Sequence, residues 1–284
     1  GHAAFLPLSL SALLLSSLNF KKALFAFLVA LVLAGVSLIL QPAMIADEKR
    51  TSAEKGSARA YGLTLLNAPL RNLLVSDILV RFCEQIPYAF VVIWCVSINK
   101  ITPLQFGLLT TIEMITAMLV YIPVAYLADK STKKPFVVTT FVFFTIFPLV
   151  LLVAQSFWVM AIAFVIRGLK EFGEPTRKAL IMDLAPDGRK AATFGVYYLI
   201  RDIIVSVAAF GGALLWDAST AKFLIDTVGM GQSLLPFFNA IASPATNFLV
   251  AFGFGLIGTL YFAFFGQDLG RSGSPITQTQ SAKE

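Results

Sequence analysis

Ten residues, Tyr126-Leu-Ala-Asp-Lys-Ser-Thr-Lys-Lys-Pro135, separate two long apolar runs and decide how the chain folds. The run before them, 104–127, carries one charged residue, Glu113, and the run after them, 136–154, carries none. A turn this short brings the second run back antiparallel to the first. Four of the ten residues are charged, so the turn must lie in water while its neighbours lie in lipid. Because cytoplasmic turns collect Lys and Arg, this turn also predicts which side of the membrane is inside.

The same turn resembles a known motif. Residues 125–134 read Ala-Tyr-Leu-Ala-Asp-Lys-Ser-Thr-Lys-Lys, which is similar to the signature loop of the major facilitator superfamily, usually written G-x-L-A-D-R-x-G-R-K. Ala125 and Thr132 replace the two glycines, as is frequent in the second copy of this loop. The resemblance implies a membrane transporter with these residues at a cytoplasmic gate. The matching charged positions, with Lys for Arg, are Asp129, Lys130, Lys133 and Lys134.

The composition is that of a membrane protein. Of the 284 residues, 57% are hydrophobic and 13% are charged, and the mean hydropathy is +0.80. Soluble domains are about 25% charged, so most of this chain has no aqueous surface to cover. The net charge of +6 comes from short basic turns rather than from one basic face, which argues against a nucleic-acid partner. Cys83 and Cys95 are expected on one helix about 18 Å apart, too far for a disulfide.

The apolar runs predict an all-α, polytopic membrane helix bundle. Residues 1–45 are read as the last helices of an N-terminal bundle, the first of them incomplete and the second a plain span at 23–40. A polar linker at 46–72 is followed by a C-terminal six-helix bundle over 73–268 and a polar tail at 269–284. Spans need about 20 residues. The six expected spans are 73–98, 104–127, 136–154, 157–182, 191–216 and 246–266.

The basic residues orient this bundle. Fourteen Lys and Arg residues fall on the proposed inside, against four on the proposed outside. The linker, the turn at 126–135 and the tail are therefore expected in the cytoplasm, and the chain in the plasma (inner) membrane. The connection 217–245 would then be an external loop, which could include a short interfacial helix.

A second region supports the resemblance. Residues 167–186, beginning Arg-Gly-Leu-Lys-Glu-Phe-Gly-Glu-Pro, and residues 194–201 are similar to the tenth and eleventh helices of bacterial members of the superfamily. Val207-Ala208 stands where antiporters have a glycine–proline pair, which weakens an antiporter assignment. A long linker before six spans is the layout of a transporter's second half. The resemblance thus implies a chain truncated at its N-terminus, whose partner is the missing N-terminal half.

One motif in the chain points to another class of protein. Gly253-Phe-Gly255-Leu-Ile-Gly258 matches the dinucleotide fingerprint G-x-G-x-x-G, which needs a strand before it and a helix after it. Here it lies inside an apolar span, so we read it as small residues that let helices pack closely. The sequence has no zinc motif, nucleophile elbow or phosphate loop, and its one histidine is His2. It therefore predicts no enzyme, no cofactor and no metal site.

The candidate functional residues are ionisable groups inside the spans. Four different helices place them at nearly one depth by helical rise. A charge at mid-bilayer costs a few kcal/mol, so these groups should face a water-filled cavity or one another. Arg81 with Glu84 and Arg167 with Glu171 have the spacing to pair along a helix. These ionisable residues either line a substrate and proton path or form structural ion pairs that hold the helices in register. The group is Arg81, Glu84, Glu113, Arg167, Lys170, Glu171, Arg201 and Asp202.

Pro175 is expected to kink or break the span at 157–182, because proline removes a backbone hydrogen bond. Glu174, Arg177 and Lys178 would then lie near the cytoplasmic surface, beside Asp129 in the family arrangement. They form an inner gate or an ordinary interfacial charge cluster.

These observations predict a secondary transporter that moves a small solute by alternating access. The alternative is a non-transporting membrane scaffold or sensor built on the same bundle. Both signs of charge in the path suit a zwitterion, an organic anion with a proton, or an amphiphilic drug. Glu113 has no basic residue in its own span, so it is the candidate proton carrier. The alternative is that Glu113 only neutralises an Arg on a neighbouring helix.

Overall fold

The computed structural model describes residues 20–44, 65–129, 132–229 and 232–268, and all regular structure within these ranges is helical. Among these described residues, five helical segments are long and apolar enough to cross a membrane. This confirms the predicted all-α membrane bundle. The five segments are Ala68–Ile98, Pro103–Tyr121, Lys134–Val153, Lys190–Trp216 and Pro244–Phe265.

The first of these segments is interrupted. It consists of helix α3 (Ala68–Gln85), the short α4 (Phe90–Val92) and a π-helix η4 (Ile93–Ile98). The chain leaves the helix at Ile86, and Pro87, which cannot donate a backbone hydrogen bond, follows directly. The prediction of one continuous helix over 73–98 is therefore wrong.

Helix α3 also begins earlier than expected. The side chain of Asn67 accepts a hydrogen bond from the backbone N–H of Leu70 at 3.0 Å, and a proline stands in the first turn. Both are helix-start signals. Cys83 in α3 and Cys95 in η4 consequently lie on different helical pieces, and both are buried.

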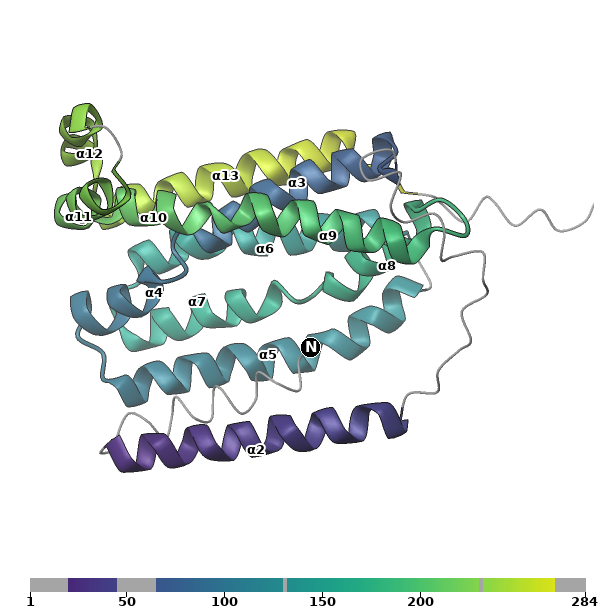
Figure 1. The fold of residues 1–284 in the computed structure, drawn as a ribbon, viewed down its shortest axis with the longest axis horizontal. Coiled ribbons are helices and arrows are strands. Elements are labelled where there is room, and N and C mark those ends of the chain that lie inside the picture. Colours follow the sequence, from purple (N-terminus) through teal and green to yellow (C-terminus); the bar gives the residue numbers. More distant parts are fainter. Residues whose placement is uncertain (1–19, 45–64, 130–131, 230–231, 269–284) are drawn as a thin grey trace, which may run out of the picture.

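Helices α5 (Pro103–Asp129) and α6 (Lys134–Val153) flank the charged turn from which the fold was inferred. As predicted, only a short connection separates them, and the two helices are antiparallel (Figure 1). Lys130 lies outside the described residues.

The span predicted at 157–182 is two helices, α7 (Phe157–Leu169) and α8 (Glu174–Leu184). Residues 170–173 form a turn between them, and Pro175 stands in the first turn of α8. The predicted break is therefore present, just before the proline. With 13 and 11 residues, neither piece alone has the length of a span.

Close backbone contacts accompany this break. A Cβ at Gly168 would lie 2.6 Å from the carbonyl oxygen of Glu113, and one at Gly173 would lie 2.5 Å from that of Phe136. The break is thus packed directly against α5 on one side and α6 on the other.

The remaining elements complete the bundle. Helix α9 (Lys190–Ser206) continues into α10 (Ala208–Trp216), and α13 (Pro244–Phe265) is the last long helix. The connection predicted as an external loop contains helices α11 (Ala218–Val228) and α12 (Leu235–Ile241). Asp217 caps α11 by accepting from the backbone N–H groups of Ser219 and Thr220, both at 2.9 Å. The described part of this connection thus contains two α-helices, where at most one short helix was expected.

Helix α13 packs against α3 and α6 through its glycines. A Cβ at Gly255 would meet the sulfur of Cys83 at 2.8 Å, and one at Gly258 would meet the carbonyl oxygen of Ser76 at 2.9 Å. Gly253 has no such neighbour within 4 Å. The close-packing interpretation of the G-x-G-x-x-G stretch is thus confirmed at two of its three glycines.

Apolar side chains gather in two main buried clusters, one toward each end of the bundle. The first includes Leu70, Phe141 and Phe262, and the second includes Phe90, Phe164 and Phe248. Along α3–α4, α7–α8 and α9–α10 the ionisable residues lie mainly between the residues of these two clusters. The core is therefore apolar at its ends and charged at its middle.

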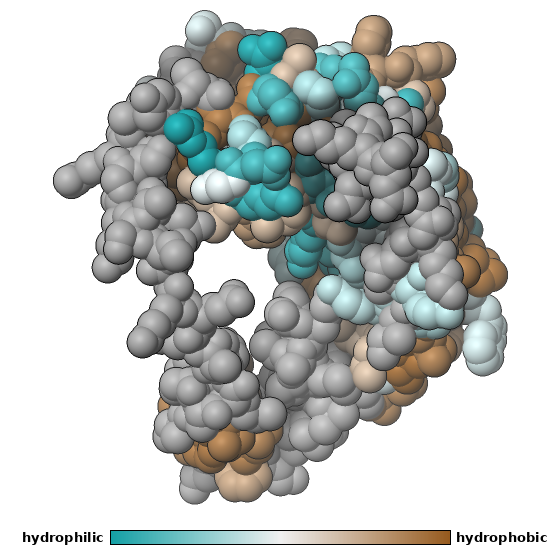
Figure 2. Space-filling view, turned by 90° about the vertical axis from the view of Figure 1, so that its right-hand side faces the viewer, coloured by the Kyte–Doolittle hydropathy of each residue, from teal (hydrophilic) through white to brown (hydrophobic). Residues whose placement is uncertain are grey.

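The end of the bundle where α3 begins, here called the Asn67 end, is held by side chains that cap other helices. Asn67 donates to the carbonyl oxygen of Leu184 at 2.8 Å, and Asn72 donates to that of Phe265 at 3.2 Å. Asp268 accepts from the backbone N–H of Lys134 at 2.8 Å. Figure 2 faces this end and shows hydrophilic surface there, with apolar surface along the sides.

Helix α2 (Phe20–Met44) precedes these elements and runs along the lower edge of Figure 1. Its described large apolar side chains, such as Phe25, Leu31 and Val32, are exposed. This exposure suits a helix surrounded by lipid.

Candidate functional site

Charged side chains from five helical pieces join in one buried ion-pair network. Helix α3 contributes Asp77, Arg81 and Glu84, and α5 contributes Glu113. The C-terminal end of α7 and the start of α8 contribute two residues each, and α9 contributes one cation and a tyrosine. The members from these three helices are Arg167, Lys170, Glu174, Arg177, Tyr197 and Arg201.

Asp77 is the centre of the part nearer the Asn67 end. Its carboxylate pairs with the guanidinium of Arg177, and both side chains are 1% exposed. Tyr197 donates its hydroxyl to the same carboxylate at 3.1 Å, and Arg201 approaches it at 3.5 Å. Glu174 holds the other side of Arg177, with a closest N–O distance of 2.6 Å. Because each charge here has hydrogen-bonded partners, the desolvation cost of burial is offset.

Arg81 connects this part to the remainder. Its guanidinium donates to Glu84 at 2.7 Å and to Glu174 at 3.3 Å. Lys170 donates to the second oxygen of Glu84 at 2.8 Å and lies 3.5 Å from Glu113. Arg167 reaches Glu113 at 3.3 Å. The network therefore runs without interruption from α9 to α5.

The break between α7 and α8 places three charges of the network at helix ends. A helix carries partial negative charge at its C-terminus and partial positive charge at its N-terminus. Arg167 and Lys170 stand at the C-terminal end of α7, while Glu174 is the first residue of α8. Each charge thus lies at the helix end that favours it.

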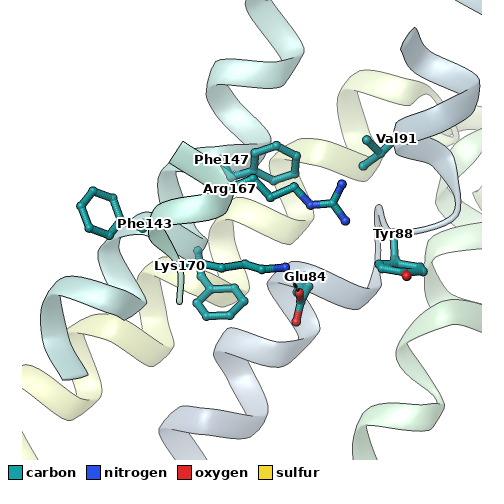
Figure 3. A pocket seen from close by; sticks show the side chains of 8 residues that line it. Glu84, Tyr88, Val91, Phe143, Phe147, Arg167 and Lys170 are labelled. Carbon is teal, nitrogen blue, oxygen red and sulfur yellow. Dashed lines mark hydrogen bonds and ion pairs between the residues drawn. The ribbon is translucent and has the colours of Figure 1, made fainter. Parts of the chain in front are cut away.

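A small pocket lies beside the Arg167 end of the network (Figure 3). The guanidinium of Arg167 is held among three aromatic rings, with centroids at 5.8 Å for Tyr88, 5.4 Å for Phe147 and 5.7 Å for Phe164. These are cation–π distances. The pocket is lined by Glu84, Tyr88, Val91, Phe143, Phe144, Phe147, Arg167 and Lys170.

The predicted pairings have different outcomes. The Arg81–Glu84 pair is confirmed. Arg167 and Glu171 do not share a continuous helix, because α7 ends at Leu169, so their expected helical spacing is wrong. Glu113 contacts Arg167 and Lys170, which is the arrangement of the alternative interpretation, a cap on a cation of a neighbouring helix.

The predicted gate residues separate into two groups. Glu174 and Arg177 are buried in the network, so the prediction that they lie near the surface is wrong, because α8 begins with them inside the bundle. Lys133 pairs with Asp183 of α8 at the Asn67 end. Lys134 begins α6, and Asp129 ends α5.

Two candidates lie at the margin of the network. Asp202 has a side chain 61% exposed, and it pairs with its neighbour Arg201 at 2.7 Å. Glu171 is half-buried in the turn between α7 and α8.

Sequence reasoning missed Asp77. It lies four and seven residues before Arg81 and Glu84, which places all three on one face of α3. That spacing was a usable signal. It was overlooked because the span was expected to begin at residue 73, which put Asp77 close to the helix end. The capped start at Ala68 places Asp77 deeper in the bundle.

Within the described residues, no group of three or more His, Cys, Asp or Glu side chains is placed to hold a metal ion. The site can bind charge and aromatic surface through its own side chains.

The fold and the network define a polytopic membrane protein with a charged interior around a broken helix. The sequence matches the model of the Major Facilitator Superfamily over residues 73–280, and the chain belongs to this family. It is a membrane transporter of the major facilitator kind. Neither the curated proteins nor the solved structures provide a match.

Proposed function

We propose that this protein is a secondary transporter that moves a small solute by alternating access, with the ion-pair network as one wall of the solute path. Transporters of this kind move two helical bundles about a site near the membrane midplane. A second bundle, such as the N-terminal half of a full-length protein, would supply the other wall. The plasma membrane, with the Asn67 end in the cytoplasm, is the setting we propose.

The network itself carries this proposal. Ionisable groups inside a membrane are expensive and usually mark a pathway for ions or substrates. Apolar residues would join the same helices at lower cost. The broken α7–α8 helix is a further support, since discontinuous helices commonly form transporter binding sites. Proton coupling is the form of energy input that the buried carboxylates support, and Glu113 remains the carrier to test.

The test uses a strain that lacks the gene and the same strain complemented with the full-length protein. Solute contents of cells and medium are compared, and a candidate solute is then followed in proteoliposomes. We expect a defined solute to change its distribution and to show exchange that needs the protein. If no solute distribution depends on the gene, the alternative of a membrane scaffold or sensor is favoured instead.

A further inference from the structure

Arg167 differs from the other cations of the network in its hydrogen bonding. Arg81, Lys170, Arg177 and Arg201 each donate at least one hydrogen bond to a carboxylate. Arg167 approaches Glu113 through Nε at 3.3 Å, and within the described structure it donates no hydrogen bond. A guanidinium has five N–H donors in a rigid planar fork. The outer edge of this fork is available to a ligand.

The available edge faces the pocket. Figure 3 shows the guanidinium extending from α7 toward Tyr88 and Val91 on the α3–α4 segment. The side chain of Arg167 is 13% exposed, so it is neither sealed in the core nor free in solvent. A low-dielectric wall of aromatic rings strengthens any hydrogen bond made there.

We propose that Arg167 binds the carboxylate of an amphipathic organic acid, whose apolar body lies on the ring of Tyr88. The inference rests on the proposed function, because it names the substrate class for the same wall of the path. Arg forks match the two oxygens of a carboxylate in a planar, bidentate contact. This contact would give Arg167 the hydrogen bonds that the other cations of the network already have.

The shape of the pocket defines how such a ligand sits. Its cavity volume is about 10 Å³, which is room for about one water molecule. The enclosed space is therefore too small for a whole ligand, whose apolar body would stay at the pocket mouth. The ring of Tyr88 is 55% exposed, so it offers an aromatic face to the body of the ligand at the pocket mouth.

A cationic ligand is disfavoured by the same geometry. Glu84 is the one carboxylate that lines the pocket among the described residues, and both its oxygens already accept hydrogen bonds, from Lys170 at 2.8 Å and from Arg81 at 2.7 Å. An ammonium group would have to share these oxygens with Lys170 and Arg81, and it would face the positive charge of Arg167.

The test measures binding of benzoate to the purified full-length protein by isothermal titration. Benzamide serves as the neutral probe of the same shape, and benzylammonium as the cationic one. Arg167→Lys keeps the charge and removes the planar fork. The matched control is Arg71→Lys, the same change at an exposed position at the start of α3. Tyr88→Ala removes the proposed aromatic contact from an exposed ring.

We expect benzoate to bind at least about 10-fold more tightly than either other probe, because hydrogen bonds between two charged groups are about twice as strong as neutral ones. Arg167→Lys should weaken benzoate binding by about 10-fold or more, while Arg71→Lys should leave it unchanged. Tyr88→Ala, which removes no ion pair of the network, should weaken it about 2- to 10-fold. Equal binding of benzoate and benzamide would overturn the proposal, as would wild-type affinity in both Arg167→Lys and Tyr88→Ala.

The result can be separated from that for transport. If benzoate binds with this selectivity but no solute distribution depends on the gene, the binding site stands and the transport proposal fails. If the protein transports a neutral or cationic solute and ignores benzoate, transport stands and the present inference fails.

Discussion

At the scale of single residues, Asp77 is the acid that joins the most buried partners. It contacts Arg177, Tyr197 and Arg201, which come from two other helices. Its Oδ1 atom and the Nε atom of Arg81 lie 3.8 Å apart, and both are buried without a hydrogen-bond partner among the described residues. Asp77 therefore balances several positive charges at once.

Asp77→Asn should destabilise the protein by about 3–5 kcal/mol, because it removes one partner of a buried pair and leaves Arg177 under-compensated. Thermal unfolding of the detergent-solubilised protein measures the loss. The control is Asp187→Asn, since Asp187 is fully exposed in the turn before α9, and its effect should stay within about 0.5 kcal/mol. Equal stability of the two variants would contradict a central role for Asp77.

Glu113→Gln tests proton coupling. Because Glu113 is the carboxylate that contacts Arg167, its loss should disturb the solute site, and proton-driven uptake and equilibrium exchange should fall together, by about 10-fold. Both are measured in proteoliposomes with the full-length protein. Lost uptake with intact exchange would show instead that Glu113 carries the coupled proton.

At the scale of elements, the helix breaks place the functional groups. Pro87 and Tyr88 form the turn after α3, and the turn 170–173 separates α7 from α8. Both interruptions lie in the middle of the bundle, beside the network. On a continuous helix Arg167, Lys170 and Glu174 would also share a face, because they lie three and four residues apart. What the break adds is two helix ends, the C-terminal end of α7 beside Arg167 and Lys170 and the N-terminal end of α8 at Glu174.

The glycines of α13 give a prediction at this scale. Gly258→Ala should destabilise the protein by about 1–3 kcal/mol, because the added methyl group would meet the backbone of α3 at 2.9 Å. Gly253→Ala, in the same motif but with open space around it, should be neutral or stabilising by up to about 1 kcal/mol. Thermal unfolding compares the two. Similar destabilisation by both changes would mean that close packing does not explain this motif.

At the scale of the whole molecule, the core of the bundle is apolar toward its two ends and charged at its middle. The surface at the Asn67 end is polar (Figure 2). The two apolar clusters enclose the network and limit its contact with water and lipid. The connection from α10 to α13 lies at the opposite end from the connection between α8 and α9 (Figure 1). In the proposed membrane orientation, these two connections therefore lie on opposite sides of the membrane.

Cysteine labelling tests this orientation. Lys222→Cys in α11 should react with a membrane-impermeant maleimide added to sealed right-side-out vesicles, whereas Asp187→Cys should not. Both positions are exposed, so only their side of the membrane differs. The native Cys83 and Cys95 are buried and should contribute little background. The reverse labelling pattern would invert the proposed topology.

The sequence by itself determined the class of fold, the antiparallel turn around 126–135 and the break near Pro175. These follow from hydropathy, charge and proline, which are local properties of the chain. It also singled out most of the network, because an ionisable residue inside an apolar run is conspicuous without any structure.

Only the tertiary structure decided which charges meet. Arg177 pairs with Asp77 across 100 residues of sequence, and Arg81 reaches Glu174 across 93. Such pairs depend on the rotation of each helix about its axis and on where each helix breaks. For Arg167, too, the sequence did not identify the partner, since its spacing predicted a pair with Glu171 on the same helix. The break at 170–173 and the packing of α7 on α5 directed it to Glu113 and the aromatic pocket instead.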